Sequence, residues 1–257
     1  MKLYWLEQTE ADVPASNDWL SEPELVRLAS LRFPKRRADW RLGRWTAKNA
    51  AAACLRVSNN NQALTSIEIR AAQSGAPEVF IRNDPAKIAI SLSHRNGRAA
   101  CAVGPISSVA MGCDLEISET HSDAFIGEYF TAEEQGMVAV LDPHYRSGFV
   151  TLLWSAKESA LKALREGLRL STREVRVELD PQQFCNAIGT APEASDGDCF
   201  KPISWFPLQV SSDHRIFGGW WNKAEHLVRT VVAEPDCDVP SMLKILDGTT
   251  SQVGCEP

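Results

Sequence analysis

The sequence lacks several features that would define its class. No apolar run approaches the ~18 residues of a membrane-spanning helix, and residues 1–9 lack the apolar segment of a secretion signal. The seven cysteines are an odd number and include no C-x-x-C pair, which argues against a disulfide framework and a zinc site. We therefore expect a cytoplasmic protein that has no membrane partner.

A strong excess of positive charge is also missing. The net charge of −6 disfavours nonspecific nucleic-acid binding, which draws on many phosphate contacts. A polyanionic ligand would therefore need a local basic patch. The helical pattern from Pro34 to Arg56 supplies one, because four basic residues recur on one of its faces. These residues are Arg37, Arg41, Arg44 and Lys48.

The 257 residues contain 44% apolar side chains, enough to bury an ordinary core. Twice along the chain, helical patterns are followed by short strand-like runs, which predicts an α/β (α+β) fold. We see no residue-level repeat that would prove a duplication. The expected division is an N-terminal lobe, a C-terminal lobe and a loosely attached tail rich in polar and small residues, at residues 1–107, 108–233 and 234–257 respectively.

A candidate metal site lies in the predicted strand Val109–Ile117. Alternation places Asp114 and Glu116 on one face, next to two small residues that leave room for a ligand. Such a carboxylate pair repels itself unless it is solvated or bridged by a cation, and its hard oxygen atoms suit Mg²⁺. For a lone D-x-E pattern, the solvated face of an edge strand is the more common explanation.

A second candidate cluster lies in the predicted helix from about Arg146 to Glu166. Lys157 falls within the apolar stripe of this helix, where it must pair, snorkel or meet a ligand. Glu158 lies at the edge of that stripe. Together with Lys162 it could form an ordinary i, i+4 salt bridge, so these two residues alone do not establish a site.

Two further segments contain polar groups. The run from Ser91 to Gly97 ends a strand with hydroxyls, an imidazole and an arginine, groups that can bind phosphate but are also common in turns. The dipeptide Asn96-Gly97 predicts a hairpin there.

In the run from Phe130 to Glu134, Thr131 and Glu134 have the spacing of a helix capping box, which is the favoured explanation of this segment.

The order and content of these motifs resemble the 4′-phosphopantetheinyl transferase family, in its larger, pseudo-dimeric type that activates carrier proteins of peptide, polyketide and siderophore synthases. The resemblance covers about residues 35–162. Gly112 to Glu116 is similar to the family's G-x-D-x-E, and Trp154 to Lys162 to its W-x-x-K-E-x-x-x-K. The weaker elements are Phe130 to Glu134, Ser91 to His94, and the basic helix that starts at Lys35.

The resemblance implies a fold and a set of roles. Two similar lobes would be related by a pseudo-twofold axis, with the site in the cleft between them. Asp114, Glu116 and Glu158 would hold Mg²⁺ against the pyrophosphate of coenzyme A. The expected contacts to the coenzyme come from basic and hydroxyl side chains, namely Arg37, Arg44, Ser93, His94, Lys157 and Lys162.

The implied reaction is attack of a carrier-protein serine on coenzyme A, with an acyl or peptidyl carrier domain as partner and the enzyme acting as a monomer. Either Glu158 or a metal-bound hydroxide could accept the serine proton, and Lys162 would neutralise phosphate charge. The alternatives are a metal-dependent phosphohydrolase or nuclease, which would use water instead of serine, and a non-enzymatic coenzyme A or carrier-binding module.

Two residues depart from the family pattern. Ala76 stands where the family usually has the lysine of G-K-P, so one expected cationic contact to coenzyme A is missing. Arg95 replaces the small residue that commonly follows S-H, and our hypothesis is that it supplies the lost positive charge.

Overall fold

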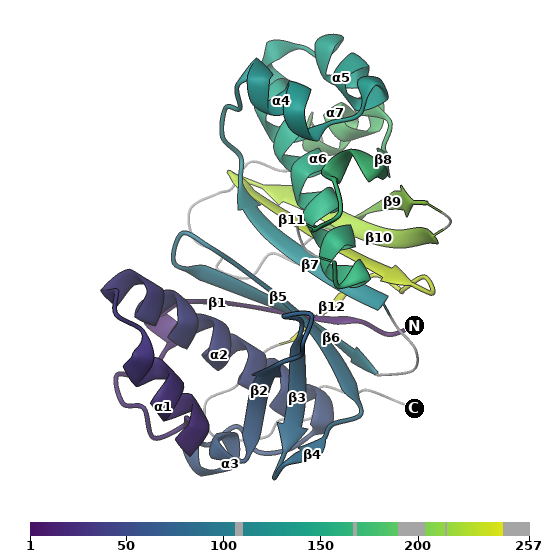
Figure 1. The fold of residues 1–257 in the computed structure, drawn as a ribbon. Coiled ribbons are helices and arrows are strands. Elements are labelled where there is room, and N and C mark those ends of the chain that lie inside the picture. The colour runs from purple at the N-terminus through teal and green to yellow at the C-terminus, as the bar shows by residue number, and fades with distance from the viewer. Residues whose placement is uncertain (106–109, 167–168, 190–203, 214, 244–257) are drawn as a thin grey trace.

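The chain folds into two α/β halves that lie one above the other (Figure 1). The computed structural model describes residues 1–105, 110–166, 169–189, 204–213 and 215–243. The mixed α/β class predicted from the sequence is confirmed. None of the helices in these ranges combines the length and the apolar character needed to cross a membrane.

The N-terminal half packs helices against two small sheets. One sheet has the order β12-β1-β6-β5 and the other the order β2-β3-β4. The helices are α1 (Glu22–Ser30), α2 (Pro34–Leu55) and α3 (Asn61–Thr65). The strands are β1 (Tyr4–Thr9), β2 (Ile67–Ala71), β3 (Pro77–Ile81), β4 (Asp84–Pro85), β5 (Ile88–Arg95) and β6 (Arg98–Pro105).

The C-terminal half places helices against one sheet of order β7-β11-β10-β9-β8. The helices are α4 (Asp123–Tyr129), α5 (Ala132–Ala139), α6 (Pro143–Leu164) and α7 (Pro181–Gly189). The strands are β7 (Ala110–Ile117), β8 (Val175–Glu178), β9 (Phe206–Ser212), β10 (Arg215–Ala224) and β11 (Leu227–Glu234). Figure 1 shows α6 lying across β7 and β11.

The segment after β11 is firmly attached, contrary to the expected loose tail. It returns to the N-terminal half, where β12 (Ser241–Met242) pairs in parallel with β1. Backbone hydrogen bonds from Asp238 N to Met1 O and from Leu243 N to Trp5 O extend this attachment. These contacts join residues 238–243 to the N-terminal half, while residues 244–257 lie outside the described part of the chain.

Each half has its own buried core, and a third core joins them. The third core is formed by side chains from β1, β6, β7 and β11, including Trp5, Ala100 and Cys113, all with no measurable exposure. The predicted alternation along β7 is confirmed on this face, because Met111, Cys113 and Leu115 point into the third core. The opposite face of β7 is thereby directed at α6.

The long helices of the two halves match in detail. Helices α2 and α6 each have 22 residues, begin with proline, and end at an arginine in the left-handed conformation, Arg56 (φ 55°) and Arg165 (φ 60°). Trp45-Thr46-Ala47-Lys48 in α2 occupies the same helical positions as Trp154-Ser155-Ala156-Lys157 in α6. A residue-level repeat is therefore present after all, although a twofold axis between the lobes stays a prediction.

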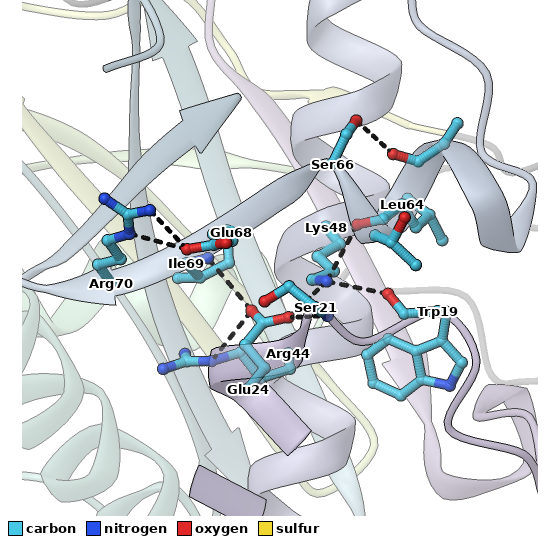
Figure 2. Close-up of polar contacts among 12 residues, drawn as sticks. Trp19, Ser21, Glu24, Arg44, Lys48, Leu64, Ser66, Glu68, Ile69 and Arg70 are labelled. Atoms are coloured by element: carbon cyan, nitrogen blue, oxygen red, sulfur yellow. Dashed lines mark hydrogen bonds and ion pairs between the residues drawn. The ribbon is translucent and has the colours of Figure 1, made fainter. Parts of the chain in front are cut away.

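A buried ion pair is built on this repeat. In the N-terminal half, Lys48 is fully buried, with its Nζ 2.5 Å from Glu24 Oε2 and donating to the carbonyl oxygens of Trp19 and Leu64 (Figure 2). Glu24 closes the capping box of α1, and its other oxygen accepts from the backbone N–H of Ile69 in β2. Lys48 and Glu24 thus link helices α2 and α1 to strand β2.

The C-terminal half repeats this arrangement. Lys157 is also fully buried, with its Nζ 2.8 Å from Glu134 Oε2. It donates to the carbonyl oxygens of Thr172 and Val175. Glu134 closes the capping box of α5 and accepts from the backbone N–H of Val177 in β8. The predicted capping box is confirmed, and its glutamate has this second function.

We predict that Lys157→Met lowers the free energy of unfolding by about 3–5 kcal/mol, because it leaves the Glu134 carboxylate buried without its cation. The free energy is measured by urea denaturation. The double variant Lys157→Met/Glu134→Gln should recover part of this loss, since no uncompensated charge remains. A loss below about 1 kcal/mol in the single variant would contradict a stabilising role for the pair.

Candidate active site

The site begins with an unusually close contact between α6 and β7 at Gly112. A Cβ atom on Gly112 would lie 1.8 Å from the carbonyl oxygen of Ser159 and 2.7 Å from the backbone nitrogen of Ala163. Only glycine leaves room for the helix backbone at this distance. The small side chains Ser155 and Ser159 also face the sheet and hydrogen-bond the hydroxyl of Thr230 in β11. The contact places the last turns of α6 directly over β7.

Asp114 lies under α6 and is only 3% exposed. Its Oδ1 accepts two hydrogen bonds of 2.8 Å, from Lys162 Nζ and from Ser93 Oγ. Its Oδ2 is buried and has no hydrogen-bond partner. The explanation of the D-x-E pattern as a solvated edge face is therefore wrong for Asp114. A buried carboxylate oxygen without a partner is costly, which marks this atom as a candidate ligand.

Glu116 lies further along the same face of β7 and is partly buried. Burial and the charge of Asp114 raise its pKa to about 7, although Arg95 opposes this shift. Arg95 Nε lies 3.2 Å from Glu116 Oε2, and its terminal nitrogen donates to Glu119 Oε1 at 2.8 Å. Arg95 therefore partly neutralises two carboxylates at the edge of the site.

Glu158 and Lys162 extend the cluster from α6. Burial and the charge of Asp114 raise the pKa of Glu158. Burial, the largest single influence, lowers the pKa of Lys162, but the charge of Asp114, its hydrogen bond and the charges of Cys113 and Glu158 together outweigh burial. The net shift is therefore upward, so the ammonium stays charged. Lys162 donates to Asp114 and to the Cys113 carbonyl, and within the described chain no ion pair joins it to Glu158. The i, i+4 salt bridge considered from the sequence is not formed.

The chemistry of these groups fits a divalent cation. Across the described ranges, no three histidine, cysteine or acidic side chains are gathered into a preassembled metal cluster. Asp114 nevertheless has one buried oxygen without a partner, and its charge raises the pKa of both Glu116 and Glu158. Three hard carboxylate groups whose charge is only partly neutralised are the donors that Mg²⁺ prefers. The donor set is thus suitable, although it is not assembled in this conformation.

A cavity of about 480 Å³ reaches Lys162, the ion-pair partner of Asp114, and is lined by both halves of the chain. The N-terminal half contributes residues of β3, β5 and the Gly75-Ala76-Pro77 turn. The C-terminal half contributes Met111 and the end of α6, including Lys162 and Arg165. Its volume lies within the range of roughly 300–1,000 Å³ that is usual for small-molecule sites. Lys162 is the residue that lines the cavity and also contacts Asp114.

The other residues expected to contact the coenzyme differ in their exposure and in their partners. Ser93 is buried, with its hydroxyl donated to Asp114, whereas His94 is exposed at the end of β5. Arg37 is exposed near the start of α2. Arg44 lies over the Trp40 ring, 4.9 Å from its centroid. The Arg44 Nε atom also lies 3.9 Å from Glu24 Oε1 (Figure 2). Neither arginine lines the cavity described above.

Lys157 and the basic stripe of α2 need correction. Lys157 is enclosed by Glu134 and two backbone carbonyls, so its ammonium is not available for the phosphate contact expected from the sequence. In the stripe, Lys48 is buried against Glu24, and Arg41 donates to backbone carbonyls of the Pro14 to Ser16 segment. The stripe is therefore not a continuous basic surface.

Sequence reasoning missed two contributors. Glu134 holds the buried Lys157, and the repeated Trp-x-Ala-Lys pattern of α2 and α6 could have indicated that this lysine is structural. Arg165 lines the cavity from the end of α6, and no motif in the sequence marks it.

A family comparison agrees with this geometry. Residues 110–206 match the model of the 4′-phosphopantetheinyl transferase superfamily, so the chain carries a domain of that superfamily. The match begins at β7 and includes Asp114, Glu116 and all of α6. The resemblance read from the sequence motifs is thereby confirmed at the level of the superfamily. No curated protein matches the chain.

We predict that Gly112→Ala lowers the free energy of unfolding by at least about 3 kcal/mol, because the new methyl group overlaps the backbone of α6 and the helix must move. The matched control is Gly136→Ala in α5, where a Cβ has no neighbour within 4 Å. Alanine favours helix over glycine by about 1 kcal/mol, so the control should be neutral or more stable. Equal stability of the two variants in urea denaturation would refute the close contact.

Proposed function

We propose that this chain transfers the 4′-phosphopantetheine arm of coenzyme A to a serine of an apo acyl or peptidyl carrier protein. The products are the holo carrier and adenosine 3′,5′-bisphosphate. The superfamily match supports phosphopantetheinyl transfer in general. The coenzyme and the carrier are the finer part of the proposal.

One observation carries the proposal. The buried Asp114 has one free oxygen and binds Lys162 through the other, and Lys162 lines a cavity large enough for a nucleotide. Phosphoryl-type transfer requires mainly that reactants are aligned and that charge on the phosphate oxygens is neutralised. A carboxylate cluster beside a charged lysine and an enclosed cavity is suited to both requirements.

Asp114, Glu116 and Glu158 would hold Mg²⁺. When bound there, the ion would supply positive charge next to the pyrophosphate of the coenzyme. The raised pKa of Glu116 and of Glu158 fits this role, because both carboxylates lack full neutralisation in the protein alone. Ser93 and Lys162 fix the position of Asp114 through its Oδ1 atom, which leaves Oδ2 available.

In the reaction, the carrier serine oxygen forms a bond to the β-phosphorus of coenzyme A. The bond from that phosphorus to the bridging pyrophosphate oxygen breaks, and the electron pair leaves with adenosine 3′,5′-bisphosphate. Glu158 is the candidate to accept the serine proton, since its raised pKa makes it a better base than an ordinary carboxylate. The Lys162 ammonium stabilises negative charge on phosphate oxygens.

The experiment mixes purified protein, coenzyme A and Mg²⁺ with a panel of apo acyl and peptidyl carriers. Intact-protein mass spectrometry should detect addition of one phosphopantetheine group to a carrier serine. Release of adenosine 3′,5′-bisphosphate without any carrier would instead indicate a phosphohydrolase. Binding of coenzyme A with no turnover on any carrier would indicate a binding module.

We predict that Asp114→Asn reduces the rate of transfer by at least about 100-fold while the protein stays folded. The amide keeps the shape of the side chain, so Ser93 retains an acceptor, but the charge opposite Lys162 is lost. Initial rates are compared at saturating coenzyme A, with circular dichroism as the folding control. A folded variant with wild-type rates would remove Asp114 from the proposed machinery.

We predict a specific pH dependence of stability from Glu116. Its pKa in the folded protein is about 7 and thus above the unfolded value, so the folded state binds more protons between these values. The free energy of unfolding should therefore fall as the pH rises from about 4.5 to about 7. Glu116→Gln removes this contribution.

The test measures urea denaturation of both proteins at several pH values in EDTA. Because Glu158 titrates in both, the comparison isolates Glu116. The stability of wild type relative to Glu116→Gln should decline between pH 4 and pH 8. A constant difference over this range would refute the raised pKa.

A further inference from the structure

The cavity between the two halves has few charged groups. Among the residues that line it, only Glu78, Lys162 and Arg165 carry charge, and the rest are apolar or neutral polar. A nucleotide with several phosphate groups needs more than one cation in such a site. Because Lys162 is already bound to Asp114 and to the Cys113 carbonyl, it cannot alone neutralise a polyphosphate.

Arg165 is the cation of the cavity whose ion pair is weak enough to leave it able to bind a ligand. Its side chain is half exposed, and the ion pair recorded for it in the described chain is with Glu78, where NH1 lies 3.9 Å from Oε1. That distance is at the limit of an ion pair, and pairs this exposed contribute little to stability. The guanidinium, with its five donors, can therefore turn toward a ligand at small cost.

The position of Arg165 relative to Ala76 is informative. Both residues line the same cavity, Ala76 from the turn before β3 and Arg165 from the end of α6. Arg95, the other arginine considered as a source of charge, contacts Glu116 and Glu119 and does not line this cavity. Arg165, and not Arg95, is thus the arginine that lines the same cavity as Ala76.

We propose that Arg165 binds a phosphate group of coenzyme A and so sets the affinity of the site for the nucleotide. This inference rests on the proposed function, since it assigns a further binding residue to the same site. Glu78 is the competing partner of the guanidinium, and the phosphate takes its place. Arg165 therefore acts on binding of the coenzyme and not on the chemical step.

The structure supplies a matched control for Arg165. Arg56 ends α2 in the same left-handed conformation (φ 55°, against 60° for Arg165), but it does not line the cavity. Substitution at either site removes one positive charge from the end of a 22-residue helix. If both variants change coenzyme A binding, the cause is the lost charge at a helix end. If only the Arg165 variant changes it, the cause is the position of Arg165 in the cavity.

The experiment measures binding of coenzyme A and of 3′-dephospho-coenzyme A by isothermal titration calorimetry. Arg165→Gln should weaken coenzyme A binding by about 10-fold or more, the usual worth of a charge-assisted hydrogen bond, while Arg56→Gln binds like wild type. Loss confined to coenzyme A identifies the 3′-phosphate as the partner. Equal loss with both nucleotides identifies the pyrophosphate.

Glu78 distinguishes a binding role from a structural pair. If Arg165 binds phosphate, Glu78→Gln removes a competing carboxylate and should tighten binding by about 2- to 5-fold, the reverse of the arginine variant. If the two residues only hold the halves together, both variants should weaken binding. In the background of Arg165→Gln, Ala76→Lys should restore affinity, because it returns a cation to the opposite wall of the cavity.

Different results would overturn the proposed function and the role of Arg165. Wild-type protein that neither binds coenzyme A nor modifies a carrier would overturn the proposed function. Wild-type protein that does both, with an Arg165→Gln variant that binds coenzyme A normally, would overturn the assignment of Arg165 alone. Weaker binding by Glu78→Gln would also overturn it.

Discussion

The contact between the backbone of α6 and Gly112 is the constraint on which the candidate site depends. Because no side chain separates helix and strand there, the last turns of α6 lie directly on β7. Lys162 then reaches Asp114 at 2.8 Å, and Glu158 is close enough for its pKa to respond to the same carboxylate. A larger residue at position 112 would lift the helix and separate these groups. Gly112 is thus needed for the packing of α6 on β7, and this packing brings the charged groups of the site together.

Charge balance distinguishes this centre from other buried acids. Glu7, between the two halves, receives two hydrogen bonds from Arg229, at 2.7 and 3.0 Å, so both of its oxygens are neutralised. Glu24 and Glu134 are each matched by a buried lysine. Asp114 differs, because one oxygen has partners and the other has none. Stability alone would favour full pairing, so the free oxygen fits a group that receives a ligand.

The sequence predicted local structure well and long-range partners poorly. The Asn96-Gly97 hairpin, helix α2 and the alternation along β7 were read correctly, because turn chemistry and periodicity are local. The partner of Lys157 could not be predicted, since Glu134 lies on a separate helix and only the fold brings it near. The attachment of β12 to β1 was missed for the same reason, because it joins residues from opposite ends of the chain.

The repeat between α2 and α6 separates structural from functional residues. The buried lysine occurs in both helices and makes the same type of ion pair in each half, so Lys157 serves the fold. The next position differs, with Asn49 in α2 and Glu158 in α6, and Lys162 corresponds to Ala53. Asn49 hydrogen-bonds within its own helix, whereas Glu158 and Lys162 interact with Asp114. Residues that both halves share maintain their packing, and the residues that only α6 carries converge on a single centre. The acidic and basic groups of this centre, Asp114, Glu158 and Lys162, therefore all come from β7 and α6.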